Sequence, residues 1–267
     1  RCTDARCATD WGHEEVVSDS IIWITGATSG IGEAMAATVP YPDARVINAS
    51  RRPHPVLESI HLDLADPATW SRLTDHFISE LATFTGTRAI LVHNAFVAPP
   101  VGFSGEVDAH EYQAHAVGNA AAPLVLGDAF LRAVRTCGRR DLQAGVVMMS
   151  SAAARVPFAG QSGYGASKAA MEQWVRTVRS ELAHRGSSTW VVAVRPGAID
   201  TPSLRVAAAA DPHDFPTAAG AQQALAAGLV DSPEVAALRI WDVLPPGPDT
   251  PAVVLLGEML APPRAEG

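Results

Sequence analysis

The sequence predicts an α/β fold, in which helices cover both faces of one doubly wound parallel sheet within a single domain. Three observations support this class. Short apolar runs recur along the chain, as expected of strands that are buried on both faces. Stretches with helical periodicity separate most of these runs. The chain has 267 residues, of which 48% are apolar and 18% charged, enough to bury the core that such a sheet requires.

Seven short runs are expected to form the strands. They are mostly apolar, and their length suits strands better than buried helices. In chain order, the expected strands are residues 21–25, 45–49, 60–64, 89–92, 145–149, 190–194 and 252–256.

Helices are expected between most of these strands, and the expected ranges are 33–39, 67–84, 106–137, 162–185 and a last helix with Ser232 as N-cap and Pro233 as first residue. The stretch 106–137 is either one helix or two joined helices, because Pro123 removes a helical hydrogen bond. In 67–84, helical spacing places one group of apolar side chains on the core side, namely Trp70, Leu73, Phe77, Ile78 and Leu81.

Two segments depart from the alternation of strand and helix. Residues 50–59 contain Pro53 and Pro55 and leave little room for a crossover helix. The alanine-rich stretch at about 200–230 has proline and glycine breaks, and we expect it to be irregular and to act as a lid over the substrate. The single domain spans 21–260, and residues 1–20 are expected to form a disordered tail.

Composition argues against several kinds of partner. The net charge of −8 disfavours nucleic acid and anionic membranes. No continuous apolar run reaches the roughly 18 residues that a membrane span needs. Three cysteines give no disulfide framework, which fits a reducing compartment such as the cytoplasm. No metal site is expected from the candidate ligands, which are Cys2, Cys7, His13, Asp63, Asp108 and Asp128.

A glycine-rich turn joins the first expected strand to the first expected helix. Gly26, Gly30 and Gly32 follow the spacing Gly-x-x-x-Gly-x-Gly. Glycine lets the backbone approach a pyrophosphate closely, and the helix N-terminus offers N–H donors and positive dipole. The alternative is a glycine-rich turn without a ligand, and the flanking strand and helix favour the dinucleotide site over it.

The second expected strand ends at Ser50, Arg51 and Arg52. An acidic residue at this position binds the ribose 2′-hydroxyl of NAD, whereas hydroxyl and guanidinium groups suit the 2′-phosphate of NADP. We therefore expect a preference for NADP(H), and NAD(H) stays open because the two arginines can instead be solvated surface charges. Asp63, near the end of the third strand, is expected to face the adenine.

Tyr164 and Lys168 share one face of an expected helix, one turn apart. The ordinary pKa of tyrosine, roughly 10, makes it a poor proton donor or acceptor at neutral pH. A neighbouring ammonium favours the tyrosinate and lowers that pKa, so Tyr164 is expected to exchange a proton with a carbonyl or alcohol. Such pairs also occur by chance, and the neighbouring motifs decide the interpretation.

Over nearly its whole length the chain resembles the short-chain dehydrogenase/reductase family. The matching pieces agree in order and spacing, and they are residues 25–32, Asn94-Ala95, Asn119, Ser151, Tyr164 with Lys168, and residues 196–201. The resemblance implies a Rossmann-type fold. It also implies an NADPH-dependent oxidoreductase that transfers a hydride between the nicotinamide cofactor and a small carbonyl or alcohol substrate.

By this resemblance, four residues are catalytic. Tyr164 is the general acid or base, and Lys168 lowers its pKa and binds the nicotinamide ribose. Ser151 donates a hydrogen bond to the substrate oxygen; its rival Ser150 is directed away by strand alternation. Asn119 holds a water that feeds a proton relay to Lys168.

The resemblance also implies the cofactor contacts. The glycine turn holds the pyrophosphate, and Ile199 and Thr201 contact the carboxamide. The full set is Gly26, Thr28, Ser29, Gly30, Ile31, Gly32, Ser50, Arg51, Asp63, Leu64, Asn94, Tyr164, Lys168, Pro196, Gly197, Ile199 and Thr201. Family members often form dimers or tetramers through two long helices, and we expect a homodimer or homotetramer here through 106–137 and 162–185.

Two features depart from the family pattern. The usual Asn-Asn-Ala-Gly is replaced by His93-Asn94-Ala95-Phe96, so that Phe96 stands where the glycine backbone runs beside the cofactor. The short connection 50–59 resembles the branch that includes sepiapterin- and benzil-reductase-like enzymes. His93 and His115 are expected to be packing or surface residues.

Two other functions stay open. A non-catalytic dinucleotide-binding sensor would not need Ser151, Tyr164 and Lys168 together, and Phe96 is the one feature that supports it. An epimerase or dehydratase on the same sheet would need a larger C-terminal substrate domain than this chain has. The alanine, leucine and proline content of the lid suggests an apolar ketone or diketone as substrate.

Overall fold

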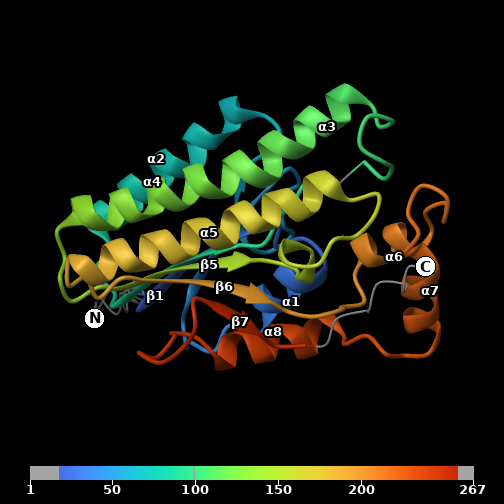
Figure 1. The fold of residues 1–267 in the computed structure, drawn as a ribbon. Coiled ribbons are helices and arrows are strands. Elements are labelled where there is room, and N and C mark those ends of the chain that lie inside the picture. Colours follow the sequence, from blue (N-terminus) through green and yellow to red (C-terminus); the bar gives the residue numbers. More distant parts are fainter. Residues whose placement is uncertain (1–17, 99, 258–267) are drawn as a thin grey trace, which may run out of the picture.

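The computed structural model describes residues 18–98 and 100–257. Within them, parallel strands form one seven-stranded sheet with the order β3-β2-β1-β4-β5-β6-β7 (Figure 1). The strands are β1 (Ser20–Thr25), β2 (Arg45–Ser50), β3 (Glu58–His61), β4 (Arg88–His93), β5 (Gln143–Met149), β6 (Trp190–Arg195) and β7 (Val253–Leu255). The chain winds outward in opposite directions from β1 and β4, and ligands bind outside the carboxyl ends of strands at such a switch point. The predicted fold class is confirmed.

Helices cover both faces of the sheet, as predicted (Figure 1). One layer consists of α2 (Trp70–Thr83), α4 (Ala122–Cys137) and α5 (Ser162–His184), and the other of α1 (Gly30–Ala37) and α8 (Pro233–Asp242). Strand alternation supplies both layers. In β1, Trp23 packs into the core shared with α2 and α4, whereas Ile24 packs into the core shared with α1 and α8.

The third strand and one helix position differ from the sequence predictions. Strand β3 ends at His61, short of the predicted Leu64, because the chain turns at Asp63, whose carbonyl oxygen accepts from Asp66 N. On α2, Ile78 is 47% exposed, so its predicted place on the core side was wrong. Its neighbour Phe77, expected on the same side, is fully buried.

The predicted long helix contains a turn of π-helix. It consists of α3 (Ala109–Ala116), the π-turn Val117–Ala121 and α4. Pro123 lacks the N–H that a regular helix would donate to the Asn119 carbonyl, which explains the break at this point. The whole stretch, Ala109–Cys137, has the length and mean hydropathy of a membrane span, but half of its most apolar 18-residue part is buried inside the protein. Leu126 and Phe130 are fully buried in the core, so this is a core helix of the fold.

The segment expected to be an irregular lid contains two helices, α6 (Pro202–Ala208) and α7 (Ala218–Ala226). The Thr201 side chain caps α6 by accepting from Leu204 N at 3.2 Å. The alanines favour helix, and the two X-Pro breaks fall in the connection between the helices. The expectation of irregular structure was therefore wrong.

The boundary of the N-terminal tail also moves. Ser20 opens β1 and is 1% exposed, and Ser18 Oγ accepts a hydrogen bond from Arg45 N at 2.9 Å. Residues 18–20 therefore belong to the domain. Residues 1–17 of the expected tail, with Cys2, Cys7 and His13, lie outside the described residues, as do 258–260 at the other end of the expected domain.

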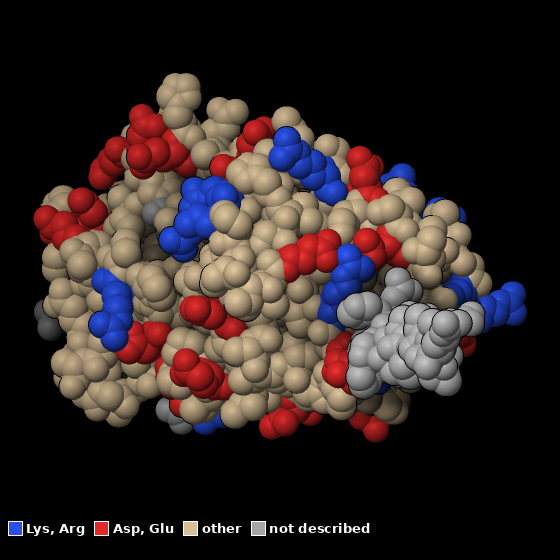
Figure 2. Space-filling model, turned by 180° about the vertical axis from the view of Figure 1, so that it is seen from behind, with Lys and Arg blue, Asp and Glu red and all other residues tan. Residues whose placement is uncertain are grey.

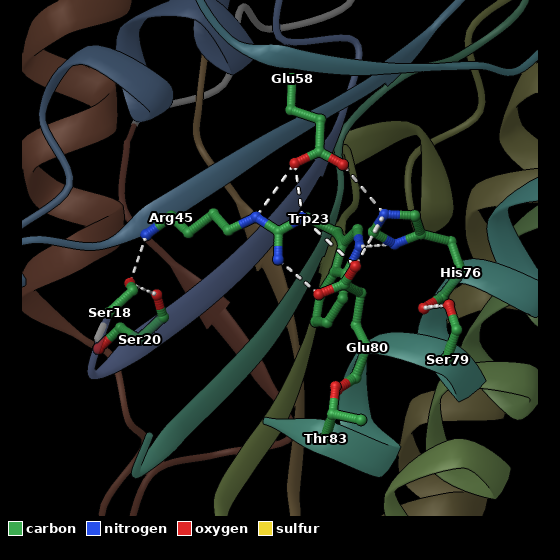
Figure 3. Close-up of polar contacts among 9 residues, drawn as sticks. All are labelled: Ser18, Ser20, Trp23, Arg45, Glu58, His76, Ser79, Glu80 and Thr83. Atoms are coloured by element: carbon green, nitrogen blue, oxygen red, sulfur yellow. Dashed lines mark hydrogen bonds and ion pairs between the residues drawn. The ribbon is translucent and has the colours of Figure 1, made fainter. Parts of the chain in front are cut away.

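The short connection after β2 has no crossover helix, and ion pairs tie this edge of the sheet to α2 (Figure 3). Arg45 at the start of β2 contacts Glu58 at the start of β3 (2.7 Å) and also pairs with Glu80 of α2. His76 Nε2 lies 3.1 Å from Glu58, and its Nδ1 accepts from the Trp23 indole at 3.1 Å. The network joins β1, β2, β3 and α2 where a helix would otherwise cover the edge.

Replacing Arg45 with methionine keeps the apolar stem and removes both ion pairs. We expect Arg45→Met to lower the free energy of unfolding by about 1 kcal/mol, the upper end for exposed pairs that form a network. Denaturant unfolding measures this. The control is Arg132→Met, which removes the isolated, exposed pair with Asp128 and is expected to cost less than about 0.5 kcal/mol. Equal losses in the two variants would contradict the proposed role of the network.

Candidate active site

The candidate site lies at the carboxyl ends of β1, β4, β5 and β6. In Figure 1 the arrowheads of β5 and β6 point toward the end of the sheet where α6 and α7 lie. The glycine turn follows β1, Asn94 follows β4, Ser151 follows β5 and Pro196 follows β6. The parallel order of these strands brings together motifs that are far apart in the sequence.

The glycine turn fits a closely approaching dinucleotide. Gly26 has φ +73° and Gly30 has φ +57°, conformations that other residues rarely adopt. At Gly32 a Cβ would lie 2.3 Å from the Gly26 carbonyl oxygen and 2.5 Å from Asn94 Nδ2. Ser29 is exposed and caps α1 without a side-chain hydrogen bond to the backbone. The turn therefore presents backbone N–H groups and a hydroxyl at a helix N-terminus, the donor set that a pyrophosphate needs.

Asn94 fixes this turn to the end of β4. Its Nδ2 donates to the Thr25 carbonyl oxygen at 3.1 Å, and its N–H donates to Thr25 Oγ1 at 2.9 Å. Asn94 therefore fixes the turn through its hydrogen bonds to Thr25 at the end of β1. The other predicted contacts in the turn, Thr28 and Ile31, are both half-buried.

A second side chain that holds the turn, Asn48, was not identified from the sequence. Asn48 is fully buried, and its Oδ1 accepts from Ala27 N at 3.2 Å. Its Nδ2 donates to the Arg52 carbonyl oxygen at 3.2 Å and to Ser59 Oγ at 3.1 Å. This single amide links the glycine turn to the segment after β2. The signal in the sequence is a polar residue within an otherwise apolar strand.

The segment after β2 leaves two guanidinium groups at the surface. Ser50 Oγ donates to the Arg52 carbonyl oxygen at 2.6 Å, and Arg51 and Arg52 are both exposed. Neither arginine forms an ion pair with any residue that the structure describes. Asp63 uses its Oδ1 to accept from Ala65 N at 2.9 Å, which shapes the turn after β3, and Leu64 is buried.

Tyr164, Ser151 and Lys168 come together where α5 passes the end of β5. Tyr164 lies in the first turn of α5 and is partly buried, and the Ser151 side chain is near enough to lower the pKa of the phenol. Lys168 is 4% exposed, and its Nζ donates to the Met149 carbonyl oxygen at 2.7 Å. The same nitrogen lies 5.6 Å from the centre of the Tyr164 ring.

Burial, rather than the Lys168 ammonium, has the largest effect on the pKa of Tyr164. Burial raises the pKa of Tyr164, and the nearby Ser151 side chain lowers it by less. Burial also lowers the pKa of Lys168 to about 8. Loss of hydration is the main cause of both shifts, and the Lys168 ammonium donates to the Met149 carbonyl oxygen.

Asn119 lies in the π-turn, and both the oxygen and the nitrogen of its side-chain amide form hydrogen bonds. Its Oδ1 accepts from Val97 N at 2.8 Å, and its Nδ2 donates to the Val97 carbonyl oxygen at 2.7 Å. The same Nδ2 lies 2.7 Å from His115 Nδ1. The amide thus fixes the chain after β4, and Pro123, four residues further on, has no N–H to donate to the Asn119 carbonyl.

Ser150 and Ser151 face different partners, as strand alternation predicted. Ser150 Oγ donates to Glu172 at 2.8 Å, a carboxylate that is 1% exposed and also accepts from Arg195 at 2.6 Å and Arg176 at 2.9 Å. Burial raises the pKa of Glu172, but the hydrogen bonds from Arg195 and Ser150 outweigh it and leave the pKa lowered. Sequence analysis missed Glu172, because its three partners come from β5, β6 and α5.

The segment after β6 covers the glycine turn. Gly197 has φ +95°, and Ile199 is buried and forms a bridge with Asp231. A Cβ at Gly30 would lie 3.4 Å from the Thr201 methyl group. Pro196 is buried just after the strand. These contacts hold the start of the lid beside the turn.

The lid also packs against the loop that precedes α5. The Gly160 carbonyl oxygen accepts from Gly102 N at 3.2 Å, and a Cβ at Gly160 would lie 2.2 Å from the Asp214 carbonyl oxygen. Gly160 has φ +81°. The loop after β4, the loop after β5 and the lid therefore meet around one glycine.

The two histidines near the site are buried and uncharged. Burial, with a smaller contribution from the Lys168 charge, lowers the pKa of His93 to about 3. Burial also lowers the pKa of His115. Both side chains are packing residues inside the fold, which is one of the two roles expected for them.

Fold and site together define a class of dinucleotide-dependent oxidoreductases. The family model described as short chain dehydrogenase matches residues 20–211, and the chain belongs to this family. It is therefore an NAD(P)-dependent oxidoreductase that interconverts carbonyl and alcohol groups. Nothing in the comparisons favours the alternative of a non-catalytic sensor.

Three known proteins are similar to the chain in sequence or in fold. It is 25% identical over 241 residues to the benzil reductase ((S)-benzoin forming) of Bacillus subtilis, covering 89% of this chain and 98% of that protein. A crystal structure of a short-chain dehydrogenase from Streptomyces avermitilis has a TM-score of 0.69 at 27% identity, covering 90% and 88% of the two chains. A short chain dehydrogenase from Burkholderia cenocepacia in complex with NADP shares the fold, with a TM-score of 0.69 at 24% identity over 92% and 98%. The predicted resemblance, including benzil-reductase-like relatives, is confirmed.

The close contact at Gly32 predicts the effect of a single methyl group. In Gly32→Ala the new Cβ meets the Gly26 carbonyl oxygen, so the turn or α1 must shift. We expect NADPH affinity to fall about tenfold or more, equivalent to about 1.4 kcal/mol, and the fold to lose about 1–3 kcal/mol. NADPH fluorescence titration and thermal unfolding measure the two effects. Gly220→Ala in α7, where a Cβ has no atom within 4 Å, is the control and should bind normally. Unchanged affinity in Gly32→Ala would show that the turn does not hold the dinucleotide.

Proposed function

We propose that this protein is an NADPH-preferring carbonyl reductase in which Tyr164 is the general acid. The observation that carries the proposal is the grouping of Ser151, Tyr164 and Lys168 at the end of β5, with the Lys168 ammonium 5.6 Å from the centre of the Tyr164 ring. The cofactor would lie along the turn and the strand ends, with Lys168, Asn94 and the segment after β6 as further contacts. When bound, the nicotinamide supplies the hydride.

The side chains supply the proton. As a carbonyl carbon gains a hydride, charge develops on its oxygen, and Ser151 and Tyr164 can each donate a hydrogen bond to that oxygen. Because burial raises the pKa of Tyr164, the phenol is protonated at neutral pH and can transfer its proton to the new alkoxide. Lys168, with a pKa of about 8, and a water on the Asn119 carbonyl then restore that proton.

The protonation state of Tyr164 also favours one direction of the carbonyl–alcohol reaction. A general base for alcohol oxidation would need a tyrosinate, which burial disfavours in the protein described here. A general acid for reduction needs the neutral phenol. We therefore propose ketone reduction as the favoured direction at neutral pH, and alcohol oxidation at more alkaline pH.

The preference for NADP(H) is supported by the surface after β2. Arg51 and Arg52 are exposed and, within the described residues, free of carboxylate partners, so they are available to a 2′-phosphate. Ser50 adds a hydroxyl at the same point. Asn48 fixes this segment to the glycine turn through its two hydrogen bonds, so both parts of the dinucleotide would be held in one frame.

The substrate is proposed to be an apolar ketone or diketone. The proposed lid, about 200–230, contains two alanine-rich helices, and Phe215 is buried within it. The Bacillus subtilis relative is named for reduction of benzil, an aromatic diketone. We further propose a cytoplasmic homodimer or homotetramer that packs through the long helices, where Val125 of α4 is 46% exposed.

Removal of the Tyr164 hydroxyl tests the proton donor. We expect Tyr164→Phe to lower kcat/KM by about 10²–10⁴-fold, the usual contribution of general acid catalysis, and to leave NADPH affinity within about threefold. Tyr112→Phe is the control, since its hydroxyl only approaches Ser162 at 3.4 Å near the surface. The assignment would be wrong if Tyr164→Phe reduced ketones at a rate within tenfold of the wild type.

Arg51→Ala tests the cofactor preference. A charge-assisted hydrogen bond contributes about 1.5–3 kcal/mol, so NADPH affinity should fall by about 10- to 150-fold, with NADH affinity unchanged. Fluorescence titration of both cofactors measures this. Arg72→Ala, an exposed arginine on α2, should change neither value. Equal losses for NADPH and NADH would mean that Arg51 does not bind the 2′-phosphate.

A further inference from the structure

Phe96 is held rigidly in the chain after β4. On one side, Ala95 N donates to Thr25 Oγ1 at 2.9 Å and to the Thr25 carbonyl oxygen at 3.0 Å. On the other side, Val97 N donates to Asn119 Oδ1 at 2.8 Å, and the Val97 carbonyl oxygen accepts from Asn119 Nδ2. Because both neighbours are fixed, the ring can move only by rotation about its own side-chain bonds.

The Phe96 ring faces away from the core. Both neighbours, Ala95 and Val97, pack against the core under α2, α4 and α5, whereas Phe96 belongs to neither hydrophobic core. Its side chain is half-buried, so part of the ring stays accessible. A packing role therefore does not account for an aromatic residue here.

Instead, the ring packs on the candidate catalytic pair. Its centre lies 6.0 Å from the centre of the Tyr164 ring at 53°, and Lys168 Nζ lies 5.9 Å from its centre. His115 contacts the Tyr164 ring as well, at 6.4 Å and 50°. These separations are typical of aromatic pairs and cation–π contacts. An accessible aromatic face thus stands beside the phenol at which the reaction is proposed to occur.

We infer that Phe96 is a specificity-determining residue, whose ring forms an aromatic wall of the substrate pocket and selects carbonyl compounds with an aryl substituent. The inference rests on the proposed function. A carbonyl oxygen that reaches the Tyr164 hydroxyl places the substituents on its carbon within reach of a ring this close to Tyr164. An aryl group gains the geometry of an aromatic pair there, which a saturated ring of the same skeleton cannot.

Binding to the enzyme saturated with NADP⁺ tests this without turnover, since the oxidised cofactor carries no hydride to donate. Calorimetry compares acetophenone with cyclohexyl methyl ketone, which has the same carbon skeleton but a saturated ring. In the wild type we expect acetophenone to bind more tightly. Aromatic pairs are worth about 0.5–1.5 kcal/mol, so Phe96→Leu should reduce the ratio of the two affinities by about two- to twelvefold. Phe96→Tyr, which keeps a ring, should retain it.

Three results would overturn the inference. One is an unchanged affinity ratio in Phe96→Leu. Another is an equal loss of affinity for both ketones together with weaker NADP⁺ binding, which would show that the ring affects cofactor binding rather than ketone binding. The third is that neither ketone binds the wild type. A failure of the proposed function looks different, because then Tyr164→Phe and the wild type would oxidise NADPH at the same rate with every ketone supplied.

Discussion

Two buried charged side chains, one helical turn apart, fix α5 to the carboxyl ends of the sheet. Lys168 donates to the Met149 carbonyl at the end of β5. Glu172 accepts from Ser150, just beyond β5, and from Arg195 at the end of β6. A buried charge without a partner would cost several kcal/mol, so the helix is held in one register. That register places Tyr164 beside Ser151, and the rest of the site is arranged around this pair.

The cofactor side of the site depends on small residues and buried amides. Gly32 allows α1 to approach the end of β1 closely, and Asn94 and Asn48 bond the backbone that this approach brings together. Thr201, at the start of the segment 200–230, packs beside Gly30. One rigid frame therefore joins the glycine turn, the segment with Arg51 and the lid, and the dinucleotide and substrate would share it.

Much of the fold followed from local patterns. Apolar runs located six of the seven strands to within about two residues, because buried parallel strands are short and continuous in hydrophobicity. The third was placed too late, since β3 is an exposed edge strand whose end is set by the turn at Asp63. The lid helices were missed because proline breaks between them hid the alanine pattern. Ile78 was misplaced because helical spacing alone cannot show how wide the buried face of α2 is.

The site was predictable where a motif is local, and less so where partners are distant in sequence. The spacing of Tyr164 and Lys168 placed both on one face of α5, but it could not reveal that burial would dominate the pKa of the phenol. Asn48 and Glu172 were overlooked because several of their partners, such as Ala27 and Arg195, are distant in sequence. Phe96 was noticed as a departure, and only the structure shows its ring against Tyr164.

The central claim, hydride transfer to a carbonyl carbon, is tested most directly by isotope transfer. The enzyme is incubated with an aryl ketone and NADPH in which deuterium replaces both hydrogens at C4 of the nicotinamide. The product is then examined by mass spectrometry. We expect an alcohol with one deuterium on its carbinol carbon. An alcohol without deuterium, or cofactor binding with no alcohol formed from any carbonyl compound, would contradict it.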